Sequence, residues 1–238
     1  MDLTGCLTIM RQVSETRDRL HMSSGRQSSG VRLGTAFYFE AQQNDSNLKS
    51  DWADIVSCNS LQNIDSELVE NLLFYSKLAL SAYAKTPEDA YLRSGIPSEY
   101  IVLSQYNSSA TMPAYVVYYK DCTAYICVRG TQQFEDVLTV LECDSDPLLH
   151  GKGHKGIVRG AKNLLLTILP TLESLKPTKT FVAGHSLGGA AAAVLVLLLR
   201  EHGGIFQNTE GYAFCPPPVI DAELMPTAMD CVISVVHG

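Results

Sequence analysis

The sequence predicts an α/β protein with a mostly parallel sheet flanked by helices. From about residue 66 to the end, strand-like and helix-like segments alternate, as they do where helices cross over between parallel strands. Apolar residues make up 46% of the chain and charged residues 18%, which is typical of a globular protein and not of a disordered one. A chain of 238 residues can also bury a sufficient core without disulfide bonds.

The chain divides into two zones of different composition. Residues 1–65 are polar and uneven and include the Ser- and Gly-rich stretch 23–30, so we expect a poorly defined N-terminal extension there. Residues 66–238 carry the periodic apolar segments and should form the α/β domain.

Helices are predicted where apolar residues recur at helical spacing, and strands where short apolar runs lie between turn residues. The expected helices cover residues 66–84, 156–175 and 187–200. The last of these is apolar on nearly all sides, so it should be buried. Asp121 and Cys122 form a turn between two strands. The expected strands cover residues 100–105, 114–119, 125–128, 180–183, 212–215 and 232–236.

Charge and cysteine usage exclude several classes of protein. Eighteen Lys and Arg against 25 Asp and Glu give a net charge of −7, which argues against a nucleic-acid partner. Seven cysteines without a CxxC pair or a ligand spacing predict reduced thiols, with no metal and no cofactor. The longest apolar run, 190–199, is shorter than the roughly 20 residues of a transmembrane helix. Charged residues within 1–20 argue against a signal peptide, so we expect a cytoplasmic protein that can still associate with membranes.

The motif that carries chemistry lies between strand 180–183 and helix 187–200. It reads Gly184-His185-Ser186-Leu187-Gly188, the G-x-S-x-G pattern of a nucleophile elbow. A serine at the apex of such a strand-to-helix turn points its Oγ out of the sheet, and the flanking glycines let neighbouring backbone approach. The helix that follows offers free N–H groups to a developing oxyanion. His185 adjoins the serine on a tight turn, so we expect it to pack rather than to act as the base.

These residues carry a resemblance to a known family. The stretch 181–190 resembles the elbow of the class 3 (fungal-type) lipases in the α/β-hydrolase superfamily. Three further segments resemble the same family, and the likeness as a whole covers residues 66–238. The first is the R-G-[ST] strand at 125–131, and the second is the H-x-G at 154–156. The third is 212–218 together with 232–238, and it resembles the diacylglycerol-lipase-like branch of the family. The resemblance implies an α/β-hydrolase fold and a serine ester hydrolase that cleaves acylglycerol lipids through an acyl-enzyme on Ser186.

The resemblance also implies roles for other residues. The oxyanion hole would use Thr131 and the backbone N–H of Leu187. Residues 132–149 would form a lid, whose apolar side could make peripheral contact with a membrane. The alternative for this segment is a surface helix of ordinary amphipathicity.

The family pattern is not complete in this sequence. A serine hydrolase of this fold needs an acid and then a histidine after the nucleophile, and in the family the acid follows the strand that is here 232–236. Asp221 and Asp230 precede that strand, and neither His202 nor His237 stands where the family has its histidine. We therefore expect a domain truncated at its C-terminal edge. The alternatives to an active hydrolase are an inactive fragment and a lipid-binding pseudo-hydrolase that lacks the triad Asp and His.

Overall fold

The computed structural model describes residues 66–109, 111–130 and 144–236, which form a six-stranded sheet with helices on both faces. The strand order is β1-β2-β3-β6-β7-β8. β3, β6, β7 and β8 run parallel, whereas β1 and β2 are antiparallel to their neighbours, so the predicted mostly parallel sheet is confirmed with one antiparallel end. The strands are β1 Ile101–Gln105, β2 Tyr115–Lys120, β3 Thr123–Val128, β6 Lys179–His185, β7 Glu210–Phe214 and β8 Val232–Val235.

The antiparallel end is closed by the predicted turn. Asp121 and Cys122 join β2 to β3 and have φ angles of 50° and 56°. Two successive residues at positive φ match the right-handed twist of the flanking strands, which is why such turns suit two-residue hairpins.

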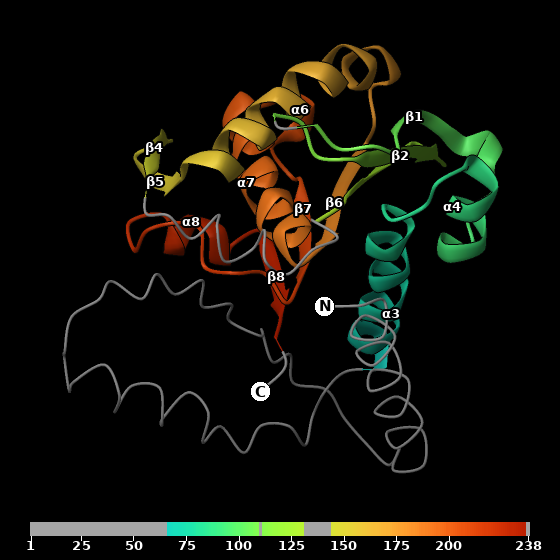
Figure 1. The fold of residues 1–238 in the computed structure, drawn as a ribbon, viewed down its shortest axis with the longest axis horizontal. Helices are drawn as coiled ribbons and strands as arrows, with labels where there is room; N and C mark the ends of the chain where they lie inside the picture. The colour runs from blue at the N-terminus through green and yellow to red at the C-terminus, as the bar shows by residue number, and fades with distance from the viewer. Residues whose placement is uncertain (1–65, 110, 131–143, 237–238) are drawn as a thin grey trace.

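Helices cover the two faces of the sheet unequally. Figure 1 shows α3 on one side of the sheet and α6 with α7 on the other. The described helices are α3 Ser66–Ser81, α4 Pro87–Ser94, α6 Lys155–Leu175, α7 Leu187–His202 and α8 Met225–Met229, with short 3-10 turns at Ser98–Tyr100 and Gly204–Phe206. Every residue of α7 from the first glycine to Leu199 is buried, as its apolar sequence predicts.

The core is split into two clusters by the sheet. Side chains of one strand alternate between them, because successive residues of a strand face opposite sides. Val117 and Ile126 pack with α6 and α7, whereas their neighbours Val116 and Cys127 pack with α3.

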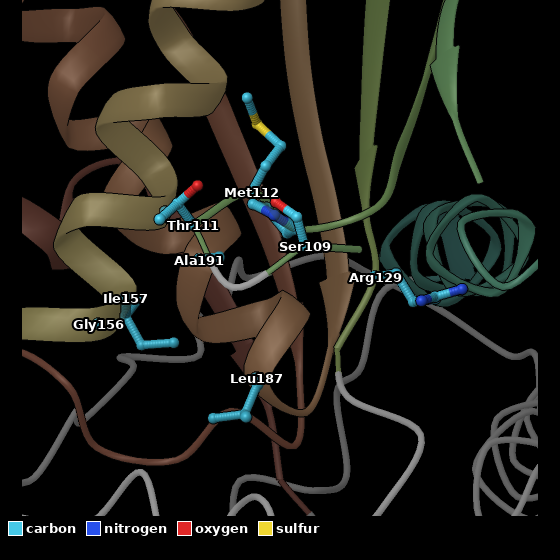
Figure 2. Close-up of a pocket in the computed structure, with 10 residues that line it drawn as sticks. Ser109, Thr111, Met112, Arg129, Gly156, Ile157, Leu187 and Ala191 are labelled. Carbon is cyan, nitrogen blue, oxygen red and sulfur yellow. The ribbon is translucent and has the colours of Figure 1, made fainter. Parts of the chain in front are cut away.

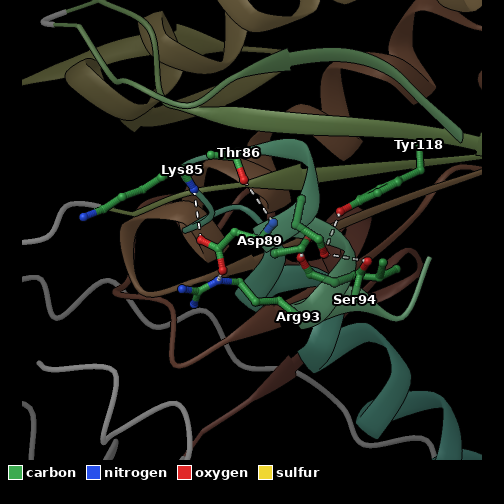
Figure 3. A network of polar contacts seen from close by, with 9 residues as sticks. Lys85, Thr86, Asp89, Arg93, Ser94 and Tyr118 are labelled. Carbon is green, nitrogen blue, oxygen red and sulfur yellow. Dashed lines mark hydrogen bonds and ion pairs between the residues drawn. The ribbon is translucent and has the colours of Figure 1, made fainter. Parts of the chain in front are cut away.

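The sequence did not predict α4, a short helix held by its own polar groups (Figure 3). The Thr86 hydroxyl accepts a hydrogen bond from the Asp89 N–H at 3.2 Å, and Asp89 pairs with Arg93 at 2.7 Å. The hydrogen bond from Arg93 keeps the pKa of the Asp89 carboxyl below its usual value. At the other end, Gly95 adopts the left-handed conformation, with φ 77°.

A second unpredicted element is the hairpin of β4 Ser145–Leu148 and β5 Gly151–His154. β5 docks on the loop after β7 through the His154 N–H, which donates to the Val219 carbonyl at 2.7 Å. The hairpin overlaps the end of the expected lid 132–149, so 145–148 is a strand rather than part of an amphipathic lid. Residues 131–143, residues 1–65 and His237 lie outside the described part of the chain.

Candidate active site

Ser186 stands alone between a strand and a helix. β6 ends at His185 and α7 begins at Leu187, and the Ser186 backbone has φ 57° and ψ −129°. A side chain other than glycine rarely adopts this conformation, because Cβ meets the backbone, and it persists only where the surroundings enforce it. The Ser186 N–H donates to the Phe214 carbonyl of β7 at 2.8 Å, and the Ser186 carbonyl accepts from the Ala190 N–H at 3.1 Å.

The Ser186 hydroxyl is left out of this backbone bonding. Serine is among the preferred residues at the start of a helix because its oxygen accepts from the first N–H groups. Ser186 makes no such capping bond to α7. The Oγ atom and the first N–H groups of the helix therefore both stay available to another molecule.

The two glycines of the motif are there because the backbone leaves no room for a side chain. A Cβ atom at Gly184 would lie 2.1 Å from the Gly188 carbonyl oxygen. A Cβ atom at Gly188 would lie 2.3 Å from the Val128 carbonyl oxygen and 2.5 Å from the Gly130 nitrogen. The end of β3 thus touches the first turn of α7, beside Ser186. Thr131 comes next in the chain but lies outside the described residues, so its part in an oxyanion hole stays a prediction.

His185 is buried and contacts Tyr83, so it is not placed to act as a general base. Its side chain is only 4% exposed, and its Nδ1 atom lies 3.3 Å from the Tyr83 hydroxyl. Burial lowers the pKa of the His185 imidazole, so the ring is neutral at neutral pH. Its Nε2 atom is buried and has no hydrogen-bond partner among the residues that the structure describes. The sequence offered no signal for Tyr83, which is 102 positions away in the chain.

Arg129 ties the end of β3 to the loop after β1. Its guanidinium donates to the Tyr106 carbonyl at 2.9 Å and to the Ser108 hydroxyl at 3.0 Å. Partial burial lowers the pKa of Arg129, but a guanidinium starts so high that it stays charged. The bonds place the loop that follows residue 106 beside the elbow.

A small cavity of about 110 Å³ adjoins the elbow (Figure 2). It lies between the first turns of α6 and α7 and the loop before β2. Leu187, which directly follows the serine, forms part of its wall. The lining is mixed: Met112, Pro113, Ile157 and Ala191 are apolar, whereas Ser109, Thr111 and Arg129 add polar groups. A small group bound in the cavity would therefore lie beside the residue that follows Ser186.

The other candidate acids and bases of the sequence are not brought to the serine. His202 ends α7, about 24 Å along that helix from Ser186, and its Nε2 atom lies 3.3 Å from a Glu173 oxygen. Asp221 accepts hydrogen bonds from the N–H groups of Lys152 and Leu224, which fastens β5 to the loop before α8. Asp230 follows α8 and is exposed.

His154 begins α6, where it belongs to the H-x-G segment. Its Nδ1 atom accepts from the Ile157 N–H at 3.5 Å, so the side chain caps the helix. Two ion pairs link β4 and the residue before it to the same helix: Asp144 with Lys155 at 2.7 Å and Asp146 with Arg159 at 3.0 Å.

In the part of the chain that the structure describes, no group of three or more His, Cys, Asp or Glu residues could hold a metal ion. Each helix within 66–109, 111–130 and 144–236 is too short or too polar to cross a membrane.

Comparison with known proteins relates this geometry to a family. Residues 125–238 match the model of the family described as lipase (class 3). Diacylglycerol lipase-beta of Mus musculus is 32% identical over 154 residues, which cover 59% of this chain and 23% of that protein. Diacylglycerol lipase-alpha of Homo sapiens is 31% identical over 131 residues, covering 48% of this chain and 12% of that protein. The chain therefore spans about a quarter or less of the length of these relatives.

Solved structures with the same arrangement of elements are fungal and other lipases. A lipase from Rhizopus microsporus var. chinensis superposes with a TM-score of 0.63 at 19% identity, covering 73% of this chain and 67% of that one. A triacylglycerol lipase described as having a serine protease triad at its catalytic centre gives a TM-score of 0.59 at 21% identity, covering 73% and 72%. Identities this low show the fold alone, and they confirm the predicted α/β-hydrolase fold.

Proposed function

We propose that this chain hydrolyses ester bonds of acylglycerol lipids, with Ser186 as the nucleophile, because residues 125–238 match the class 3 lipase family model. The observation that carries the proposal is the Ser186 backbone, held at φ 57° and ψ −129° between β6 and α7, with a hydroxyl that does not cap α7. Strain of this kind persists where function requires it. The similarity to diacylglycerol lipases favours acylglycerols over other esters.

The proposed reaction proceeds through an acyl-enzyme. Ser186 Oγ attacks the ester carbonyl carbon, and the carbonyl oxygen becomes an oxyanion beside the start of α7. The Leu187 N–H donates to it from the positive end of the helix dipole, and by family resemblance Thr131 supplies a second donor. The bond to the alcohol oxygen then breaks, and the alcohol leaves with the proton that Ser186 lost. Water adds to the acyl carbon, the bond to Ser186 Oγ breaks, and a proton from the water returns to Oγ as the fatty acid is released. Loss of one oxyanion donor would lower turnover by about 10²–10³.

The mechanism also needs a base that takes the Ser186 proton. His185 is engaged with Tyr83, and His202 lies at the far end of α7, so neither is assigned this role. That observation favours the second candidate function, a lipid-binding protein that keeps the cavity beside Leu187 but does not turn over. The two functions differ in whether Ser186 is reactive.

A fluorophosphonate probe tests the proposal in the full-length protein. Covalent labelling should occur in the wild type, vanish in Ser186→Ala and persist in Ser98→Ala, which removes the hydroxyl of an exposed serine in a 3-10 turn. Labelling that survives Ser186→Ala would contradict the nucleophile. A wild type that resists the probe yet binds diacylglycerol vesicles would favour the lipid-binding function.

Two further parts of the proposal rest on the sequence alone. They are a lid within residues 132–149 and a boundary at residue 65 between an N-terminal extension and the hydrolase domain. We propose that the part of 132–149 before β4 covers the cavity and makes peripheral contact with a membrane. The ion pairs from Asp144 and Asp146 to α6 support this, because they would anchor the end of such a lid beside the elbow.

A further inference from the structure

We propose that Tyr83 is a positioning residue of the active site, and that its hydroxyl holds the nucleophile elbow against the end of β3. This inference rests on the proposed function, because it assigns a role in presenting Ser186. Tyr83 is half-buried and lies two residues after α3, the helix on the opposite side of the sheet from α6 and α7 (Figure 1).

The Tyr83 hydroxyl sits where two backbone segments meet. It lies 3.4 Å from the His185 carbonyl oxygen and 3.3 Å from the Nδ1 atom of the same residue. A Cβ atom built on Gly130 would lie 3.1 Å from it, so the hydroxyl also lies close to Gly130, two residues after β3. One hydroxyl thus contacts the residue before the nucleophile and the residue before the expected oxyanion donor Thr131.

The His185 carbonyl belongs to the peptide bond that leads into Ser186. Rotation of that peptide plane changes the Ser186 φ angle. This angle is 57°, a positive value that is unfavourable for residues other than glycine. A donor on the His185 carbonyl resists the rotation. A single hydroxyl proton can bond either the carbonyl or Nδ1, and both bonds hold the same residue in place.

Little else in the described residues could take over this task. The cradle is too tight for a larger side chain, because a Cβ at Gly130 would lie 2.8 Å from the His185 carbonyl oxygen. The His185 Nε2 atom is buried without a partner among the described residues, so the polar hold on the ring comes from Tyr83. Without the hydroxyl, the pairing of β3 with β6 and close backbone contacts would remain, but no described side chain would hydrogen-bond the His185 carbonyl.

The consequence is a specific kinetic signature. Tyr83→Phe keeps the ring and removes only the hydroxyl, so the substrate contacts near Leu187 stay intact and KM should be unchanged. Ser186 and the oxyanion donors would lose their fixed separation, which should lower kcat about tenfold, since small displacements of reacting groups are costly.

Tyr118→Phe is the matched control. Tyr118 is a buried tyrosine of β2 whose hydroxyl donates to the Ala90 carbonyl at 3.4 Å, in the contact between the sheet and α4 (Figure 3). It loses the same atom and a bond of the same length, away from the elbow. We expect its melting temperature to fall while its kcat stays within about twofold of the wild type.

The experiment measures kcat, KM and the rate of fluorophosphonate labelling for the full-length wild type, Tyr83→Phe and Tyr118→Phe, below the melting transition of each. A tenfold lower kcat and labelling rate in Tyr83→Phe alone, at constant KM, supports the inference. Equal rates in the two variants, or a change in KM alone, overturns it and leaves the Ser186 assignment standing. Labelling that persists in Ser186→Ala, or is absent from the wild type, overturns the proposed function and this inference together.

Discussion

Two helices of this molecule begin with a hydroxyl residue and use it in opposite ways. At α4, Thr86 is extended, with φ −141° and ψ 162°, and its Oγ1 accepts from the Asp89 N–H. At α7, Ser186 has φ 57° and ψ −129° and makes no capping bond. The first residue stabilises its helix locally, whereas the second is held in a conformation that costs free energy.

The difference shows where strain has a functional meaning. Asp121 and Cys122 also have positive φ angles, but they form a hairpin turn for which that geometry is normal. Ser186 is enclosed by close backbone contacts at Gly184 and Gly188, which leave the turn no other path. Positive φ points to chemistry only where the packing enforces it and a reactive side chain results.

The largest loss of stability should come from adding a methyl group at Gly188, where the elbow has no room for one. Gly188→Ala would place Cβ 2.3 Å from the Val128 carbonyl oxygen, and this backbone atom cannot move without shifting β3. We expect a loss of about 3 kcal/mol or more in the free energy of unfolding, together with loss of probe labelling. Urea denaturation measures the first.

Gly95→Ala, at the end of α4, is the matched control for Gly188→Ala. Gly95 has φ 77° but nothing within 4 Å of a new Cβ. The cost should therefore be only the conformational one, about 1 kcal/mol, and labelling should persist. Equal destabilisation by the two alanines would mean that the elbow is not tightly enclosed.

Removing the strain at Ser186 should stabilise the protein while abolishing its chemistry. Ser186→Gly relieves about 1–3 kcal/mol of backbone strain and gives back about 1 kcal/mol through the flexibility of glycine in the unfolded state. The net gain should be about 1 kcal/mol, read as a higher melting temperature. Ser186→Ala keeps the strain and should leave stability nearly unchanged, so a gain of equal size in both variants would refute a strained serine.

The opposite change is expected at the start of α4. Thr86→Ala removes the oxygen that accepts from the Asp89 N–H and should cost about 0.5–1 kcal/mol. Thr86→Ser keeps the oxygen and should cost little. Chemical denaturation of both variants gives the comparison, and identical losses would assign the effect to the lost methyl group instead.

The sequence predicted the elements that depend on local apolar patterns. The buried runs that became β3, β6 and α7 are continuous and apolar, so their structure follows from burial alone. The G-x-S-x-G spacing then located Ser186 at a turn. Glycine is required at Gly184 and Gly188 because nearby backbone leaves no room for a side chain there.

What the sequence could not predict depends on distant or weak local features. α4 is polar and only eight residues long, so periodicity misses it, although Thr86, Pro87 and Gly95 are its start and stop signals. β4 contains Asp146 and Pro147, which are rare in strands, and it exists because it pairs with β5, which docks on the loop after β7. Tyr83 meets His185 only because the sheet brings α3 beside the elbow, and no local pattern records that contact.

The smallest expected effect is electrostatic. Stability should depend on pH through the Asp89 carboxyl at the start of α4, and no such dependence is expected from the start of α7. The Asp89 carboxyl, paired with Arg93 and bonded to the Lys85 N–H, has a pKa below its ordinary value of 3.8. A carboxyl whose pKa is lower in the folded state stabilises the protein above its unfolded pKa, and the contribution is lost as the pH falls through the folded pKa. The pair is partly exposed and solvent screens it, so the contribution should be about 0.5 kcal/mol.

Asp89→Asn would therefore lower stability at pH 7 by about that amount, and the difference should shrink as the pH falls toward and through the folded pKa of Asp89. Denaturation curves of the two proteins at pH 7 and at pH 2 measure this. The start of α7 has no acidic residue in its first turn, so Ser186→Ala should show no such pH-dependent difference in stability. A difference between wild type and Asp89→Asn that stays constant down to pH 2 would assign the effect to packing of the side chain and not to its charge.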